Sequence, residues 1–271
     1  MAGRIEIIAE IGENHLGNWA MAARLIELAA QAGADYCKFQ SYRGGDVALG
    51  DPERDWFHQV ELSDDAHRSL LDHCRRHGVQ FLSSPFTCER ADLLLSLGLT
   101  TIKVASSELT NLKLLRHLNG KAKRVFLSVG LATEEEIGTA LEALSCSEVS
   151  LLHCVSLYPT PPNKINLRSI TYLRERFGCP VGLSDHTIGC HAAIAACALG
   201  AQVIEKHVTL SRDLPGTDHV LSLDPGELNR MVSEIRDLEV MLGTACKPLS
   251  EEERAMIPLM RGRFHHGAPE G

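Results

Sequence analysis

Short apolar runs alternate along the chain with longer segments in which apolar residues recur at helical spacing. Residues 5–12 (IEIIAEIG) form the first run and have the composition of a buried strand. In residues 20–32, Leu25, Ile26 and Ala29 fall on one face of a helix. The same alternation continues as far as residue 242, so the chain is predicted to consist of repeated strand–helix units.

The periodicity also indicates where the other elements lie. Further strands are predicted at residues 35–42, 80–86, 101–108, 124–130, 150–156, 180–187 and 203–209. Helices are predicted at residues 64–76, 89–97, 112–118, 134–144, 167–177, 189–200 and 225–242. Eight strands that alternate with helices in a chain of 271 residues predict an α/β fold, a (β/α)₈ TIM barrel that occupies residues 1–243 as a single domain.

A doubly wound open sheet is the alternative fold. It is disfavoured because no G-x-G-x-x-G follows the first strand and no P-loop sequence occurs in the chain. Residues 43–62 form an unusually long polar connection between a strand and a helix. Connections of this length are often lids or binding loops.

Charge, hydrophobicity and cysteine content narrow the class of protein. The net charge of −8 argues against a nucleic-acid partner, because proteins that bind nucleic acid usually carry a basic surface. No stretch approaches the ~20 apolar residues of a membrane span, and the amino terminus has no signal-peptide run. The nine cysteines include no C-x-x-C pair, which predicts reduced thiols and a cytoplasmic protein.

Two histidines lie at the ends of neighbouring predicted strands. His186 follows the run PVGLSD and His207 follows VIEK, with a helix-like segment between them. Neighbouring strands of a parallel β-α-β unit point the same way, so both imidazoles are expected at one rim. Two neutral imidazoles there can hold a divalent metal ion and leave other coordination positions open.

The remaining strand ends are rich in lysines and hydroxyls. In chain order they carry Glu10, Lys38, Gln40, Ser83, Ser84, Lys103, Ser106, Glu108, Ser128, Ser156, Tyr158, Ser184, Asp185 and Glu205. Ammonium groups and hydroxyls suit the oxygens of phosphate and carboxylate, and the active sites of such barrels lie at the C-terminal rim. The sequence therefore predicts a site for a phosphorylated small molecule. Lys103 and Ser106 fall on opposite faces of an ideal strand, so both reach this site only if the strand is irregular.

Motifs along nearly the whole chain resemble those of one enzyme family. They are EIGENH (10–15), KFQ (38–40), FLSSPF (81–86), KVASSELTN (103–111), LSVG (127–130), HCVSLYP (153–159), GLSDHT (182–187), EKH (205–207) and PGTD (215–218). By these motifs the chain is identified as a member of the sialic acid (N-acetylneuraminate) synthase family. The enzymes of this family use phosphoenolpyruvate to make nonulosonic acids.

The resemblance implies a transferase that condenses phosphoenolpyruvate with an aldose such as N-acetylmannosamine, giving a 3-deoxy-2-keto sugar acid and phosphate. It implies that Glu10, His186 and His207 are catalytic, and that the two histidines bind a divalent metal ion, Mn²⁺ or Mg²⁺. The residues implied for phosphoenolpyruvate are Lys38, Ser84, Lys103, Ser106, Ser128, Ser156 and Ser184, of which Ser156 stands where some members have Asn. The residues implied for the sugar are Gln40, Glu108, Tyr158 and Asp218.

Typical members continue past the barrel into an antifreeze-like domain that reaches across a dimer. Here residues 247–252 (KPLSEE) resemble the linker to that domain, and residues 244–271 are expected to form a tail in its place. A homodimer is expected, with the rim covered by this tail or by the 43–62 connection. The side chains expected to do so are Trp56, Phe57, Met256, Ile257, Leu259, Met260, Arg261, Arg263, Phe264, His265 and His266. A frayed terminus is the alternative for the tail.

Two other functions remain open at this stage. One is a phosphoenolpyruvate-dependent synthase for a different aldose, with Arg43 as a candidate contact for a sugar phosphate. The other is a barrel that has lost catalysis and serves as a binding or scaffold subunit. The second is less favoured because Glu10, Lys38, His186 and His207 are all present.

Overall fold

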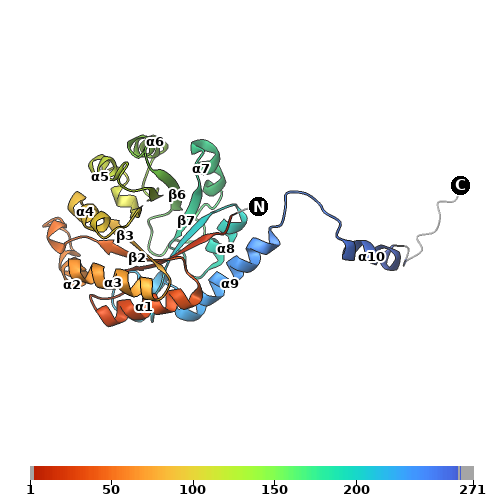
Figure 1. Ribbon diagram of the computed structural model, residues 1–271, viewed down its shortest axis with the longest axis horizontal. Helices are drawn as coiled ribbons and strands as arrows, with labels where there is room; N and C mark the ends of the chain where they lie inside the picture. Colours follow the sequence, from red (N-terminus) through yellow and green to blue (C-terminus); the bar gives the residue numbers. More distant parts are fainter. Residues whose placement is uncertain (1–2, 262, 264–271) are drawn as a thin grey trace. The chain divides into compact units, whose positions relative to one another are not determined.

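Eight parallel strands form one continuous sheet that curls into a barrel (Figure 1). The computed structural model describes residues 3–261 and 263. The strands are β1 Glu6–Gly12, β2 Tyr36–Ser41, β3 Gln80–Pro85, β4 Thr101–Val104, β5 Arg124–Ser128, β6 Glu148–Cys154, β7 Val181–Asp185 and β8 Val203–His207. They run in the order β3-β2-β1-β8-β7-β6-β5-β4, and β3 contacts β4 across the seam. The predicted (β/α)₈ barrel is therefore confirmed.

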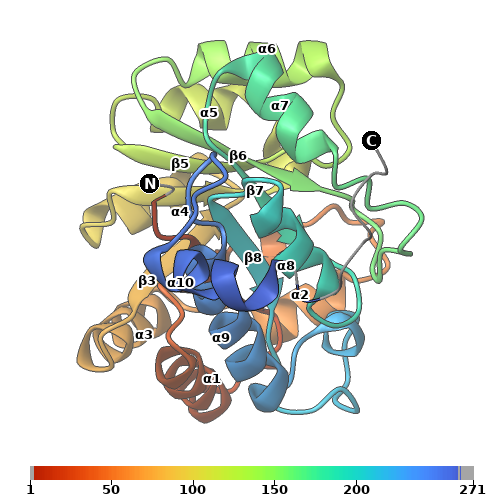
Figure 2. The same cartoon turned by 90° about the vertical axis from the view of Figure 1, so that its right-hand side faces the viewer.

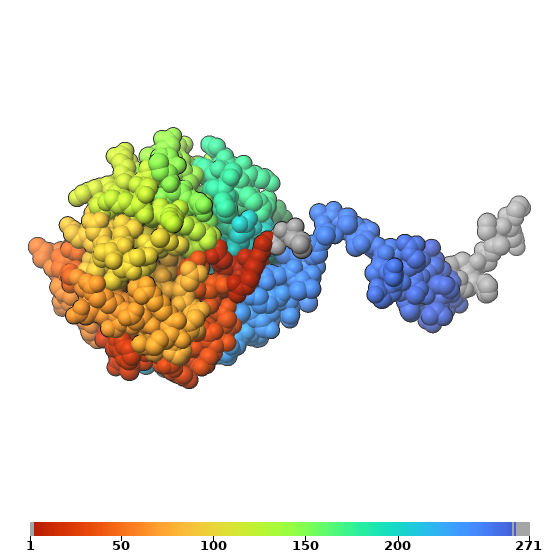
Figure 3. All heavy atoms as spheres, in the orientation of Figure 1, coloured from red at the N-terminus to blue at the C-terminus, as the bar shows by residue number. Residues whose placement is uncertain are grey.

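Helices cover the outer face of the sheet. They are α1 Trp19–Ala32, α3 Asp64–Arg76, α4 Cys88–Ser96, α5 Leu112–Leu118, α6 Glu134–Ala143, α7 Ser169–Phe177, α8 His191–Ala198 and α9 Pro225–Met241. Asn18, Ser63, Thr87 and Thr133 accept hydrogen bonds from first-turn amides, which is why α1, α3, α4 and α6 begin where they do. Figure 2 shows α8, α9 and α1 side by side, and α9 contacts both neighbours. Figure 3, in the orientation of Figure 1, shows the colours passing around the barrel in chain order.

Apolar side chains divide between the two faces of the sheet. The larger cluster lies between the sheet and the helices and includes Ile7, Cys37 and Leu183. A smaller cluster lies inside the barrel and consists of Ile8, Tyr36, Leu82, Phe126, Leu152 and Val203. Side chains alternate between the two faces along each strand, so the next inward residue lies two positions further on.

One ion pair is fully buried in the outer layer. Lys206 Nζ lies 2.9 Å from Asp185 Oδ2 and also contacts the carbonyl of Thr187. Asp185 Oδ1 accepts a hydrogen bond from the Thr187 amide at 2.8 Å. Strand alternation predicts that Lys206 faces the helices, and it does. Asp185, which the sequence grouped with the rim residues, pairs with it in this layer, and together they join β7 to β8.

Three segments differ from the prediction. The 43–62 connection contains the turn η1 Gly44–Asp46 and the helix α2 Arg54–Val60. The strand predicted at 101–108 ends at Val104, because Ser106–Glu108 form the turn η2. Helix α10 Glu251–Met260 lies in the segment expected to be a tail. α2 and η2 are too short for a helical period to be visible in the sequence.

The described residues from Leu242 to Arg261 belong to a separate unit. Ser250 caps α10 by accepting a hydrogen bond from the Glu253 amide at 3.1 Å, and Pro258 lies inside the helix. Phe264, His265 and His266, which were expected to help cover the rim, lie outside the described residues. Among the residues that are described, none belongs to a helix with the length and hydrophobicity to span a bilayer.

Candidate active site

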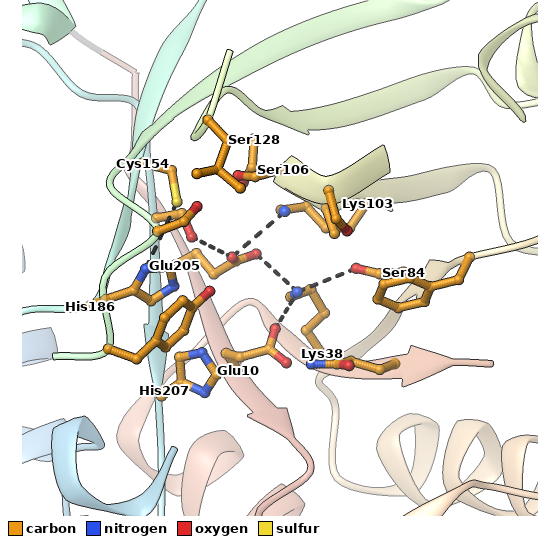
Figure 4. A pocket seen from close by; sticks show the side chains of 18 residues that line it. Glu10, Lys38, Ser84, Lys103, Ser106, Ser128, Cys154, His186, Glu205 and His207 are labelled. Carbon is orange, nitrogen blue, oxygen red and sulfur yellow. Dashed lines mark hydrogen bonds and ion pairs between the residues drawn. The ribbon is translucent and has the colours of Figure 1, made fainter. Parts of the chain in front are cut away.

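A cavity of about 390 Å³ opens at the C-terminal ends of the strands (Figure 4). Its lining includes most of the residues predicted for the site, namely Glu10, Lys38, Gln40, Ser84, Lys103, Ser106, Ser128, Ser156, Tyr158, Ser184, His186 and His207. Glu108 and Asp218 are not part of the lining. The structure thus brings together residues from all eight strand ends.

Strand alternation explains why these side chains meet. The buried polar residues of the cavity lie two positions beyond the members of the interior apolar cluster. The pairs are Ile8 and Glu10, Tyr36 and Lys38, Leu82 and Ser84, Phe126 and Ser128, Leu152 and Cys154, and Val203 and Glu205. Because successive side chains alternate faces, each of these residues points into the barrel one step above the apolar cluster.

Two lysines and two carboxylates form the charged centre of the cavity. Lys38 Nζ contacts Glu10 Oε2 and lies 3.4 Å from Glu205 Oε2. Lys103 Nζ lies 3.7 Å from Glu205 Oε1, which also accepts a hydrogen bond from Ser184 Oγ at 2.7 Å. The structure therefore holds two buried cations beside a shared carboxylate, in a position to meet an anion entering the cavity.

Burial and charge shift the pKa values of Lys38 and Glu205 in this centre. Burial lowers the pKa of Lys38 to about 8, although the carboxylate of Glu205 opposes the shift. Burial would raise the pKa of Glu205, but Lys103 and Lys38 outweigh it and lower that pKa to about 2. Glu205 therefore stays ionised and compensates the lysines until a ligand replaces it as their partner.

Several buried polar atoms in the cavity lack a partner. Within the described residues, Glu10 Oε1 and Ser128 Oγ have no hydrogen-bond partner, whereas Glu10 Oε2 contacts Lys38 Nζ. Lys38 Nζ also donates to Ser84 Oγ at a long 3.3 Å. Buried polar groups normally have hydrogen-bond partners, so unpaired groups that face a cavity are available to a bound molecule. Glu10 and Ser128 are thus arranged to interact with a bound molecule.

A glycine makes room for three of the hydroxyl and thiol groups. A Cβ on Gly130 would lie 2.5 Å from Ser156 Oγ, 2.8 Å from Ser106 Oγ and 3.2 Å from Cys154 Sγ. The amide of Gly130 donates to Ser106 Oγ at 3.1 Å. Ser106 reaches the same cavity as Lys103 because β4 ends at Val104 and the turn η2 re-aims the chain. The sequence predicted that Lys103 and Ser106 could share one site only if the strand were irregular, and the turn η2 is that irregularity.

The two histidines lie together on one side of the cavity. Their ring centroids are 5.6 Å apart, and the ring of Tyr158 stacks on His186 at 4.1 Å. His186 Nδ1 donates to the carbonyl of Val155 at 3.0 Å, which leaves Nε2 as the atom with a free lone pair. Burial, together with the charges of His186 and Lys38, holds the pKa of His207 well below its usual value. His207 is therefore a neutral imidazole.

The surroundings of His207 fit a divalent cation. Asp218 Oδ2 lies 3.5 Å from His207 Nδ1, which has no hydrogen-bond partner in the described part of the chain. Gly12 has φ +52, and a Cβ there would lie 2.9 Å from Glu10 Oε1, 3.4 Å from His207 Cε1 and 3.6 Å from Asp218 Oδ2. Two imidazoles and two carboxylates around this space form a mixed nitrogen and oxygen donor set, which can hold a divalent cation.

The other predicted sugar contacts lie in different places. Gln40 and Tyr158 line the cavity, and Tyr158 is half exposed at its mouth. Asp218 lies beside His207, just outside the lining. Glu108 lies in the turn η2, where its Oε2 accepts a hydrogen bond from Asn111 Nδ2 at 2.7 Å. Of the four, Glu108 is the one without a contact to the rest of the site.

Six residues of the lining received no role from the sequence, namely Phe86, Ala105, Ser107, Leu131, Cys154 and Glu205, and the last two contact predicted residues. Glu205 is the common partner of both lysines, and Cys154 Sγ lies 3.8 Å from His186 Nδ1. Glu205 was recognised on the rim, and its position two residues before His207 already placed it on the same strand face. Cys154 gave no chemical signal, although its place two residues after Leu152 puts it inside the barrel.

The long 43–62 connection lies against the loops of this rim. Trp56 Nε1 of α2 donates to Glu13 Oε2 at 2.6 Å, and Tyr42 donates to Glu13 Oε1 at 3.2 Å. The Trp56 ring would lie 3.1 Å from a Cβ on Gly216, in the loop that carries Asp218. Burial raises the pKa of Glu13 to about 7, an effect that the Trp56 hydrogen bond opposes. Glu13 thus links α2, through the Trp56 hydrogen bond, to the segment that follows β1.

Comparisons with known proteins agree with this geometry. The family model described as "NeuB family" matches residues 25–247. The N,N'-diacetyllegionaminic acid synthase of Campylobacter jejuni is 38% identical over 94% of this chain and 82% of its own length. The human N-acetylneuraminate-9-phosphate synthase is 33% identical over 92% of this chain and 74% of its own length. The crystal structure of N-acetylneuraminic acid synthetase from Leptospira borgpetersenii superposes with a TM-score of 0.88 at 32% identity, covering 97% of this chain and 93% of that one.

Proposed function

This chain belongs to the NeuB family, and from that premise we propose that it condenses phosphoenolpyruvate with an amino sugar of the N-acetylmannosamine type. The product is a 3-deoxy-2-keto sugar acid, and phosphate is released. One observation carries the proposal: a single cavity holds two buried lysines among hydroxyls on one side and a pair of buried histidines on the other. The first half suits a phosphorylated carboxylic acid and the second suits an aldehyde and a metal ion.

The anion half is assigned to phosphoenolpyruvate. Lys38 and Lys103 bind its phosphate and carboxylate by charge-assisted hydrogen bonds, and they give up part of their contact with Glu205 to do so. The hydroxyls of this half complete the contacts and fix the orientation of the enol. They belong to Ser84, Ser106, Ser128, Ser156 and Ser184.

The histidine half is assigned to a divalent cation, Mn²⁺ or Mg²⁺, and to the sugar. His186 and His207 would hold the cation, which when bound supplies Lewis-acid polarisation of an aldehyde oxygen. Gln40, Tyr158 and Asp218 lie around this half and are assigned to the sugar. Glu108, in the turn η2, is assigned to the sugar by the family resemblance alone.

The reaction forms a carbon–carbon bond and a carbon–oxygen bond to water, and it breaks the carbon–oxygen bond to phosphate. The methylene carbon of phosphoenolpyruvate attacks the aldehyde carbon of the open-chain sugar, which leaves a cationic carbon next to the phosphate oxygen. Water adds to that carbon, and the tetrahedral centre then expels phosphate with the electron pair of the broken bond. Glu10, whose Oε1 has no hydrogen-bond donor among the described residues, stabilises the cation and takes the proton of the attacking water. The aldehyde oxygen takes up one proton as it becomes a hydroxyl.

Phosphate release from phosphoenolpyruvate in the presence of a panel of aldoses tests this function. Mass spectrometry of the products identifies the sugar that is extended by three carbons. Release that depends on an N-acetylated amino sugar is the expected outcome. Absence of release with every aldose in the panel, at saturating Mn²⁺, would contradict the proposal.

A synthase for a different aldose, including a sugar phosphate, fits less well. Arg43, the candidate contact for a second phosphate, pairs with Asp64 at 2.9 Å on the outer connection. The panel should include phosphorylated sugars, because preference for one of them would favour this alternative. A scaffold without catalysis is not supported by a cavity in which Glu10 and Ser128 keep unpaired polar atoms.

The change Lys38→Ala is expected to weaken binding of phosphoenolpyruvate. One charge-assisted contact is lost, worth about 1.5–3 kcal/mol, or roughly ten- to a hundredfold in affinity. Titration calorimetry measures the effect, and Lys121→Ala, on the outer surface beside Asp92, is the matched control. An isotherm for the Lys38 variant that equals the control would remove Lys38 from the anion site.

We also propose that the protein acts as a homodimer in which the segment after the barrel helps to cover the rim. Support comes from α10, on which Met256, Leu259 and Met260 are exposed apolar side chains. Deletion of residues 251–271 is therefore expected to weaken the dimer, measured by light scattering, and to lower turnover with the true acceptor. If both quantities are unchanged in the shortened chain, this segment has no part in the site.

The unpaired state of the cysteines supports a cytoplasmic location. All nine cysteines are unpaired, and several are buried in the barrel. Thiols persist in this state where glutathione and thioredoxin keep them reduced. We therefore assign the reaction to the cytoplasm.

A further inference from the structure

A cluster of three potential metal ligands lies outside the barrel, where α1 contacts α3 (Figure 1). His73 and His77 are one turn apart at the end of α3, and Glu27 comes from α1. One ligand atom from each residue lies within 4.8 Å of the others. The cluster is built from helices on the outer layer and shares no residue with the cavity inside the barrel.

The buried member of the cluster has an unsatisfied atom. His73 Nε2 is buried and has no hydrogen-bond partner among the residues that are described, and its side chain is 9% exposed. It lies 3.6 Å from Glu27 Oε1, while Glu27 Oε2 is held by Arg24 at 2.9 Å. An unpaired buried nitrogen is costly, so a partner for His73 Nε2 would stabilise the helix pair.

We propose that Glu27, His73 and His77 bind a zinc ion that links α1 to α3. Two imidazoles four residues apart on a helix, with one carboxylate, form a donor set typical of Zn²⁺, whereas Mg²⁺ and Ca²⁺ select oxygen ligands. Metal–ligand bonds of about 2.0–2.2 Å place ligand atoms of a tetrahedral site about 3.3 Å apart. The 3.6 Å between His73 Nε2 and Glu27 Oε1 needs only a small adjustment. His77 is exposed, so water completes the coordination.

A neighbouring arginine competes with the metal. Arg76 Nη2 donates to His73 Nδ1 at 3.0 Å, which fixes the proton of neutral His73 on Nε2, the atom that the metal needs. Zinc binding moves that proton to Nδ1, and the exposed Arg76 side chain turns away. The structure thus predicts opposite effects for two substitutions one residue apart: loss of His77 weakens the site, and loss of Arg76 strengthens it.

Zinc titration of the full chain and its variants tests the proposal. His77→Ala and Glu27→Gln are expected to weaken zinc binding by at least about a hundredfold, because even residues that only orient metal ligands are worth about ten- to a hundredfold. Arg76→Gln is expected to tighten it. His117→Ala, on α5 beside Asp92, is the matched control and leaves binding unchanged.

Two further readouts separate this site from the cavity. Added zinc should raise the unfolding temperature of the wild type and of Arg76→Gln, but not of His77→Ala. Cobalt substitution should give a tetrahedral absorption band that disappears in His77→Ala. Turnover should stay at the wild-type level in Arg76→Gln and in His77→Ala. Equal zinc affinity and equal cobalt spectra in the wild type and His77→Ala would overturn the proposal.

Discussion

Replacement of His207 by Ala is expected to lower turnover by about a thousandfold while the fold survives. His207 is a neutral imidazole beside Asp218 and His186, and it is one of the two nitrogen ligands assigned to the catalytic cation. A Lewis acid contributes several kcal/mol of stabilisation to a developing oxyanion, and each 1.36 kcal/mol is tenfold in rate. Steady-state phosphate release measures the loss.

The His207→Ala variant should also lose the divalent cation assigned to the two histidines. Metal content by mass spectrometry is expected to fall for His207→Ala and for His186→Ala, with unchanged circular dichroism. His117→Ala serves as the control, because this histidine pairs with Asp92 on an outer helix. Full activity of the wild type in excess chelator would show that these histidines act in some other way.

Asp185→Ala is expected to lower the free energy of unfolding by about 3–5 kcal/mol. The substitution leaves Lys206 buried without its carboxylate, and uncompensated buried charges carry penalties of this size. For a domain of this length the midpoint of thermal unfolding should fall by roughly 10 °C. Both side chains are fully buried between sheet and helices, so solvent cannot replace the lost partner.

A double variant separates the charge penalty from simple loss of packing. Asp185→Leu with Lys206→Met removes both charges and keeps most of the volume, so it should regain much of the lost stability. Calorimetric unfolding of the two single variants and the double variant gives the coupling energy. If the double variant is as unstable as the sum of the single ones, the ion pair is not what joins β7 to β8.

The fold followed from the sequence because its elements are strongly periodic. Buried runs such as residues 5–12 recur eight times with helices between them, and this regularity allowed closure of the barrel to be predicted. The helix α2 was missed because its position depends on contacts of Trp56 with Glu13 and Gly216, which are distant in sequence. Local periodicity carries no information about such contacts.

The site was partly predictable for the same reason. A polar residue two positions beyond an interior apolar residue must point into the barrel, and this rule accounts for Glu10, Lys38 and Ser128. It also accounts for Cys154, which was overlooked because a cysteine in a buried strand resembles core. Pairing within the site was not predictable. That Glu205 faces both lysines, and that Asp185 faces Lys206, depends on side-chain reach between neighbouring strands.

The apolar cluster inside the barrel also bears on the order in which substrates bind and products leave. Ile8, Phe126 and Leu152 fill the barrel below the lysines, and the exposed side chains of Tyr158 and Leu131 line the cavity at its mouth. A sugar seated at that mouth blocks the passage of an anion to the buried ammonium groups. With the proposed assignment of the two halves of the cavity, phosphoenolpyruvate is expected to bind before the sugar, and the sugar acid is expected to leave before phosphate. This order follows from a cavity that apolar side chains close at its base, so it is expected for any acceptor sugar.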